Sequence, residues 1–285
     1  MTAAHLGTAG FFAPNGTDMN GIRRILCPVD FTEFSRRAAS LAAAWARQFG
    51  AEVSALHVRT NGLDRQAEAW DGPGKLSVVE GDPVDVILEQ AAALSADLIV
   101  MGTHGRRGFD RWVLGSVTER VMHHAPCPVL TVNGRSERPD PDGPPFSRVL
   151  CGDDLTPGVL TYALSLVRGS GARLEVLHAV EEVPEAGALG GTPFAYGPVL
   201  MAQARERLHA AIPAADRESG LVHEEVVCGR AYQQILRRAS SEKVDLIIMG
   251  VHSGRPFNDM FFGSTTHHVV RGADCPVLIV RRGKE

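Results

Sequence analysis

Glycines and a serine at a regular spacing could bind an anion in this chain. Residues 102–105 read GTHG, nine residues follow, and Gly115-Ser116 then begins a segment with helical spacing. Glycines let backbone amides approach an anion closely, and a helix N-terminus adds N–H donors and a favourable dipole. Ser116 would supply a hydroxyl, either as the helix N-cap or as a phosphate donor. The pattern therefore predicts a phosphate-binding loop that runs from a strand end to a helix start.

The sequence shows no catalytic set beside this loop. Neither GKS nor GKT occurs, the GxGxxG, GxSxG and HExxH motifs are absent, and no lysine is placed as a phosphoryl clamp. The acidic residues that could hold Mg²⁺ near a phosphate are limited to Asp30 and Asp110. A dedicated ATPase needs a positioned base and electrophile. We therefore expect binding without catalytic residues, and slow hydrolysis by a bound water stays open as an alternative.

Short apolar runs alternate with helical patterns, and these elements must position the loop. Strands are predicted at residues 25–30, 53–58, 76–79, 98–101 and 129–132. Thr32 is a candidate N-cap for a helix that ends at Gly50, and Asp82-Pro83 has the signature of a further helix start. Continuous apolar strands separated by helices indicate a parallel sheet covered on both faces. Ligands of such sheets bind beyond the carboxyl ends of the strands.

The chain repeats this arrangement. Residues 101–116 read MGTHGRRGFDRWVLGS and residues 249–264 read MGVHSGRPFNDMFFGS, with 7 of the 16 positions identical. The register continues into a CPVL segment at residues 127–130 and again at 275–278. We therefore predict an α/β protein of two tandem open-sheet domains, each a mostly parallel five-stranded sheet with helices on both faces. The predicted divisions are a flexible leader (1–21), domain 1 (22–133), a proline-rich linker (134–145) and domain 2 (146–282).

The composition of the chain limits which binding partners and which cellular compartment we expect. The 285 residues include 29 basic and 33 acidic ones, a formal net charge of −4, which argues against nucleic acid or an anionic membrane as the main partner. No apolar run approaches the roughly 18 residues of a membrane span. The five cysteines show no CxxC spacing, which favours buried free thiols in a reducing cytoplasm over disulfides or a zinc site. His123-His124 is not expected to bind metal, because adjacent helical residues point about 100° apart.

Asp30 at the end of the first strand and the pattern Gly102-x2-Gly105-x9-Gly115-Ser116 resemble the signature of the universal stress protein family in its tandem form. The resemblance covers residues 22–133 and 146–282, and it implies a Rossmann-like fold of the adenine nucleotide alpha-hydrolase type. For the ATP-binding branch of that family it implies ATP, with or without Mg²⁺. Carried over by position, the implied contacts to adenosine, ribose and phosphates are Pro28, Val29, Asp30, Val58, Met101, Gly102, Gly105, Gly115, Ser116 and Val117. Arg106 follows the second glycine, and we add it as a countercharge to phosphate.

The second half departs from the pattern. Its positional equivalents are Asp154, Ala179, Met249, Gly250, Ser253, Gly263 and Ser264. Ser253 stands where the second glycine is expected, and a serine costs about 1 kcal/mol or more if that position needs a positive φ. Gly254 replaces Arg106, which removes the candidate countercharge. We expect this second site to be weaker or empty.

The two predicted domains also have to fit together. The fifth strands, residues 129–132 and 277–280, are apolar edges that need covering, and we predict that they pair with each other. Further homodimerisation of the whole chain is left open. The stretch between the second and third strands, residues 59–75 in domain 1, is much shorter than its counterpart in domain 2. The helix expected there is therefore predicted to be truncated or absent, which leaves one face of that sheet less covered.

Several side chains near the predicted site allow two interpretations. Asp30 could orient adenosine or cap the turn that follows it. His104 and His252 could contact phosphate or bond the loop backbone. His57, like its counterpart His178, is expected to pack structurally at a strand end.

These residues are consistent with three functions. We expect a cytoplasmic, nucleotide-dependent regulator or sensor of the stress response that binds ATP through domain 1. The first alternative is a slow ATP hydrolase or adenylate-transferring enzyme. The second is a protein-interaction module that binds no nucleotide, which the intact glycine pattern of the first half argues against.

Overall fold

The computed structural model describes residues 21–60, 70–103, 114–136, 143–152, 155, 158–181, 196–251 and 263–281. In chain order the strands are β1 (Arg24–Pro28), β2 (Glu52–Arg59), β3 (Lys75–Glu80), β4 (Leu98–Gly102), β5 (Val129–Val132), β6 (Arg148–Gly152), β7 (Arg173–Val180), β8 (Val222–Cys228), β9 (Leu246–Val251) and β10 (Val277–Arg281). The helices are α1 (Glu33–Phe49), α2 (Pro83–Ala93), α3 (Ser116–His124), α4 (Val159–Ser170), α5 (Tyr196–Ala211), α6 (Ala214–Glu218), α7 (Ala231–Ser241) and α8 (Ser264–Gly272).

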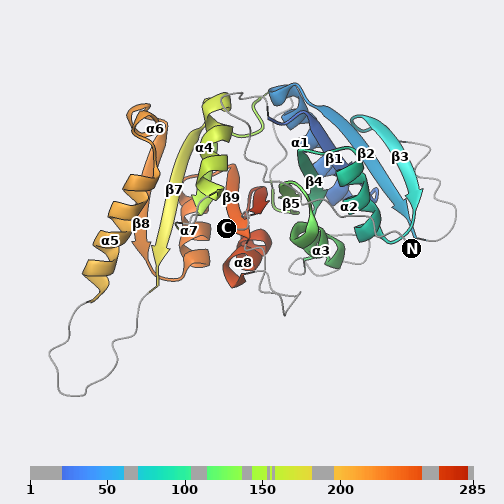
Figure 1. The fold of residues 1–285 in the computed structure, drawn as a ribbon. Coiled ribbons are helices and arrows are strands. Elements are labelled where there is room, and N and C mark those ends of the chain that lie inside the picture. The colour runs from blue at the N-terminus through green and yellow to red at the C-terminus, as the bar shows by residue number, and fades with distance from the viewer. Residues whose placement is uncertain are drawn as a thin grey trace, which may run out of the picture.

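The strands form one continuous 10-stranded sheet, in the order β3-β2-β1-β4-β5-β10-β9-β6-β7-β8. Its two ends, β3 and β8, lie far apart on opposite sides of the molecule (Figure 1). Every neighbouring pair is parallel except β5 and β10, which run antiparallel with Leu130 opposite Leu278. Within this pairing the buried hydroxyl of Thr131 donates to the carbonyl of Val277 at 3.0 Å. The predicted α/β class and the pairing of the fifth strands are therefore confirmed.

Local sequence signals account for most helix boundaries in the first half. The hydroxyl of Thr32 accepts a hydrogen bond from the Ser35 amide at the start of α1, and Gly50 ends that helix with a φ of 66°. Asp82 caps α2 by accepting hydrogen bonds from two amides, with proline at the first helical position. In the second half α4 begins only at Val159, and the predicted start at residues 156–157 lies outside the described residues.

Two apolar cores lie on opposite faces of the sheet. Adjacent strand residues point to different faces, so that Ile25 belongs to the core that includes residues of α1, α4 and α5, whereas Leu26 belongs to the core that includes residues of α2, α3, α7 and α8. Both cores continue across the β5–β10 junction, through Leu130 and Leu278 on one face and Val129 and Val277 on the other. The two halves therefore share their hydrophobic cores as well as their sheet.

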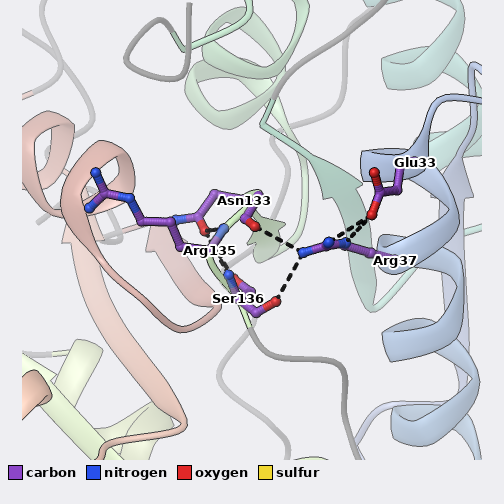
Figure 2. Close-up of polar contacts among 6 residues, drawn as sticks. Glu33, Arg37, Asn133, Arg135 and Ser136 are labelled. Carbon is purple, nitrogen blue, oxygen red and sulfur yellow. Dashed lines mark hydrogen bonds and ion pairs between the residues drawn. The ribbon is translucent and has the colours of Figure 1, made fainter.

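Polar contacts hold the chain that leaves β5 against both halves, and Figure 2 shows those that involve Arg37 of the first half. The amide of Asn133, a buried side chain, donates to the carbonyl of Ala273 at the end of α8 at 2.7 Å, and its oxygen accepts from the Arg135 and Ser136 amides. On the other side Arg37 of α1 donates to the carbonyl of Gly134 at 2.9 Å. Residues 134–136 of the predicted extended linker thus form a turn, and residues 137–142 lie outside the described part of the chain.

The crossovers that follow β2 and β7 differ between the halves. In the second half α5 and α6 fill this connection, and Arg168 of α4 binds both carboxylate oxygens of Asp216 in α6 at 2.8 and 2.5 Å. That carboxylate raises the pKa of the guanidinium, mainly through these hydrogen bonds. In the first half no helix occurs among the described residues between β2 and β3. The prediction of a truncated or absent helix concerns residues 61–69, which lie outside those described.

Phe146 offers a test of how strongly the halves depend on each other. It precedes β6, is 3% exposed, and packs on Trp45 and Phe49 of α1 at ring-centroid distances of 5.1 and 6.3 Å. Replacing it with alanine should lower the free energy of unfolding by about 3–5 kcal/mol, because the cavity spans both halves. Urea denaturation would measure this loss. A loss below about 1 kcal/mol, as for a surface substitution, would show that this contact does not join the halves.

Candidate functional site

Of the first-half residues predicted to bind the ligand, those that the structure describes gather at the carboxyl edge of the first half-sheet. β1 ends at Pro28, next to Leu56 of β2, and the following residue, Val29, donates its amide to the Leu56 carbonyl at 2.8 Å. Val58 lies near the end of β2, and β4 ends at Met101-Gly102 on the other side of β1. Because the strands are parallel, these ends share one edge, as the sequence predicts.

Hydrogen bonds fasten the two ends of the glycine-rich loop to each other. The Gly115 amide donates to the Thr103 carbonyl at 2.8 Å, and the hydroxyl of Thr118 donates to the Gly102 carbonyl at 2.9 Å. The Thr103 amide is in turn bonded to Val132 at the end of β5. The start of α3 therefore lies beside the end of β4, although Gly105 and Arg106 lie outside the described residues.

Gly115, and not Ser116, is the N-cap of α3. Its φ of −65° and ψ of 136° are extended, and Ser116 is the first helical residue, with Val117 next to it. The cap interpretation of Ser116 is therefore wrong, which leaves its other predicted role as a phosphate donor. A glycine cap has no side chain to accept from the first-turn amides, and those donors point outward from the helix end.

Gly102 has a structural reason to be glycine. A Cβ on this residue would lie 3.1 Å from the backbone and Cβ of Phe34 in the first turn of α1. The close packing of α1 against the end of β4 therefore accounts for this glycine without a ligand. Of the two described glycines of the motif, Gly115 carries the stronger indication of a binding site.

Asp30 performs the turn-capping role that the sequence left open. Its Oδ1 accepts hydrogen bonds from the amide of Thr32 at 3.1 Å and from the hydroxyl of Thr32 at 2.6 Å. Between them Phe31 has a φ of 64°, a left-handed conformation that costs an L residue about 1–2 kcal/mol. Leu155 in the second half has the same φ. A left-handed residue at this position is thus a feature of both halves, and adenosine orientation by Asp30 stays a prediction.

An aromatic cluster beside this turn was missed by sequence reasoning. The Phe31 ring lies 4.5 Å from the His57 ring and 6.2 Å from the Trp70 ring, measured between centroids. His57 is buried and its Nδ1 lies 2.8 Å from the Val29 carbonyl, which confirms the expected structural packing of this histidine. Phe31, an aromatic residue directly after Asp30, was the sequence feature that could have indicated this cluster.

The second half repeats the skeleton of the site. The hydroxyl of Thr266 in α8 donates to the Gly250 carbonyl at 3.1 Å, as Thr118 does to Gly102 in the first half. The other described counterparts are Ala179 near the end of β7, Met249 in β9, Gly263 as N-cap of α8, and Ser264 as its first residue. Asp154 and Ser253 lie outside the described residues.

The two halves differ in the side-chain packing at the ends of β1 and β6. Gly152 takes the place of Pro28 at the strand end, and a Cβ on it would lie 2.6 Å from Sδ of Met249 and 2.8 Å from Cδ1 of Ile235. The space that the Pro28 ring fills in the first half is thus occupied by these two side chains. The two strand ends therefore have different packing, and the second edge is not a copy of the first.

Three buried cysteines are not suited to act as nucleophiles at either edge. Burial raises the pKa of the Cys27 thiol in β1 to about 12, and burial likewise raises the pKa of Cys127 and Cys275 to about 12. These thiols stay protonated near neutral pH. Buried free thiols are confirmed for these three residues and Cys151, but Cys228 is exposed. Within the described ranges no three histidine, cysteine or acidic residues gather as metal ligands.

The architecture is that of a doubled, open, parallel α/β sheet, and it has solved counterparts. A universal stress protein from Archaeoglobus fulgidus has a TM-score of 0.64 and 23% sequence identity, and the match covers 94% of this chain and 99% of that chain. This likeness shows the fold. None of the helices in the described part of the chain has the length and apolarity to cross a membrane.

Sequence comparison supplies the family. The profile of the universal stress protein family matches residues 21–67, 59–133 and 146–281. A universal stress protein of Mycobacterium bovis is 28% identical over 248 residues, covering 83% of this chain and 77% of the relative. One from Methanocaldococcus jannaschii is 35% identical over 141 residues, covering 40% of this chain and 83% of the relative. The chain belongs to the universal stress protein family.

The bond between α3 and β4 can be tested by substitution. Replacing Thr118, which is buried, with valine leaves the half-buried carbonyl of Gly102 without its hydroxyl donor and should lower the free energy of unfolding by about 1–2 kcal/mol. Thr118→Ser keeps the hydroxyl and should lose less. Thr266→Val is the matched change in the second half. Equal stability of the valine and serine variants at position 118 would contradict this role of the hydroxyl.

Proposed function

We propose that the first half of this universal stress protein binds ATP at its carboxyl edge. The observation that carries the proposal is the fastening of the glycine-rich loop, which brings the first amides of α3 beside the end of β4. Outward-pointing amides at a helix start favour an anion, and the neighbouring strand ends offer apolar surface for a base. The family resemblance supplies the identity of the ligand as ATP, with Mg²⁺ as its counter-ion.

The glycines at the helix starts fit the close approach of a phosphate. The φ and ψ angles of Gly115 and Gly263 are open to any L residue. For Gly263, no heavy atom of the described residues beyond its chain neighbours lies within 4 Å of the position of a Cβ. At Gly263, neither the backbone conformation nor the packing among the described residues requires a glycine, whereas the close approach of a bound phosphate would require one.

The proposed contacts divide between base and phosphates. Pro28, Val29, Asp30 and Val58 would surround adenosine, and Met101 and Gly102 would face the ribose. The phosphates would lie between Gly105, Arg106, Gly115, Ser116 and Val117. In the second half the equivalents are Asp154, Ala179, Met249, Gly250, Ser253, Gly263 and Ser264. We propose that this second site is weaker, because Ser253 adds a side chain to the loop and Gly152 has changed the packing below it.

Within this proposal the protein acts as a nucleotide-dependent regulator or sensor of the stress response in the cytoplasm. Its buried free thiols suit a reducing compartment. Binding of ATP would stabilise one conformation of the loop and of the start of α3. A partner protein that recognises this conformation would then respond to the nucleotide. The domain limits proposed for this activity are residues 22–133 and 146–282, joined by residues 134–145.

The bound nucleotide should be identified directly. The purified protein would be denatured, and the released small molecules identified by mass and counted per chain. About one ATP per chain is expected, since one edge has the complete motif. Two would show that Ser253 is tolerated, and ADP or AMP would favour the enzyme alternative. No nucleotide, followed by no thermal shift with ATP and Mg²⁺, would favour the interaction module over the proposal.

Gly115→Val tests the site itself. The backbone at this residue accepts valine, so the fold should lose no more than about 1 kcal/mol, the cost of a poor N-cap. The added side chain would occupy the phosphate position, and the dissociation constant for ATP should rise about ten-fold or more in titration calorimetry. Gly263→Val carries the same helix cost in the second half and should weaken binding less. An unchanged affinity of Gly115→Val would refute the assigned phosphate position.

A further inference from the structure

His57 lies between the two strand ends that carry the proposed adenosine pocket. It is 2% exposed and directly precedes Val58 in β2. Its Nδ1 lies 2.8 Å from the carbonyl oxygen of Val29, the residue that follows β1. A carbonyl can only accept a hydrogen bond, so Nδ1 is the protonated nitrogen of this pair. One buried side chain therefore links both walls of the pocket.

This bond completes the attachment of Val29 to β2. The Val29 amide already donates to the Leu56 carbonyl at 2.8 Å, and the Val29 carbonyl receives the His57 proton. Both backbone polar groups of Val29 are thus bonded to neighbouring residues of one strand. Without the imidazole, the Val29 carbonyl would lose this buried donor, and β2 would lose one of its hydrogen bonds to the chain beyond β1.

The same imidazole supports the strained residue on the other side of Asp30. The Phe31 ring packs on it at 4.5 Å, with the ring planes inclined by 45°. Phe31 is held at a φ of 64°, and such a conformation persists where surrounding contacts determine it. His57 therefore contacts the residue before Asp30 through a hydrogen bond and the residue after it through ring packing.

We propose that His57 is a positioning residue of the adenosine pocket, which sets the place of Asp30 by holding Val29 and Phe31. The inference rests on the proposed binding of ATP by the first half. The second half provides the comparison, because Leu155 there replaces the aromatic residue at the same φ and His178, the counterpart of His57, is less buried.

Three variants of the full chain separate positioning from general packing. His57→Leu keeps an apolar body but removes the donor, whereas His57→Asn keeps an N–H donor at the same number of bonds from the backbone as Nδ1. Phe31→Leu introduces the residue that the second half already carries at this φ. His178→Leu is the matched control, since it changes the equivalent histidine of the other half.

The dissociation constant for ATP would be measured by calorimetry at a temperature where circular dichroism shows every variant folded. His57→Leu should weaken binding about ten-fold, and His57→Asn should recover most of that loss. Phe31→Leu should weaken binding by about three-fold, and His178→Leu should leave it unchanged. Amide NMR spectra should show the resonances of residues 29–32 displaced in His57→Leu and close to the wild type in His57→Asn.

The outcomes distinguish a failure of the proposed role of His57 from a failure of the proposed ATP binding. A wild-type protein that binds no ATP would overturn both. A wild-type protein that binds ATP, with His57→Leu binding equally well, would overturn the positioning role and leave the proposed function intact. Equal losses in His57→Leu and His57→Asn would also overturn it, because the hydrogen bond to Val29, which the proposal requires, would then have no effect on the affinity.

Discussion

The antiparallel pairing of β5 with β10 is the constraint on which the rest of this structure depends. A five-stranded parallel sheet that ends in an apolar strand presents unpaired amides and carbonyls to solvent. Here each half covers the edge of the other, and both hydrophobic cores run through the junction. Asn133 adds a buried hydrogen bond to the end of α8, so the chain leaving β5 is also fixed to the opposite half.

This arrangement leaves the carboxyl edges available for ligands. β4 pairs with both β1 and β5, and the start of α3 is fastened to the end of β4 through Gly102 and Thr103. The position of the candidate phosphate site is therefore set by the central strands, which are the most deeply buried. The proposed adenosine side depends instead on β2 and on the turn after β1, where Phe31 has a left-handed φ and His57 bonds the Val29 carbonyl.

The sequence predicted the strand positions, the doubled architecture and the starts of α1 and α2 because each has a local signal. Thr32, Gly50 and Asp82 act through bonds within a few residues, and β4 and β9 are short, continuous apolar runs. The left-handed Phe31 and the bond from His57 to Val29 were not predictable in the same way. The first is a non-glycine residue held by tertiary contacts, and the second joins residues 28 positions apart. The placement of Ser116 as a cap failed because glycine and serine both serve as N-caps.

Joining both partners of the β5–β10 pairing in one chain has a further consequence for how the two sites can differ. In a symmetric dimer every substitution appears twice, so a change that damages one site damages both. Here the interface forms within a single molecule and its occupancy does not depend on protein concentration. Gly152 and Ser253 can therefore alter one edge while Pro28 and Gly105 remain at the other. Covalent linkage thus allows the two carboxyl edges of one molecule to diverge from each other in sequence and in use.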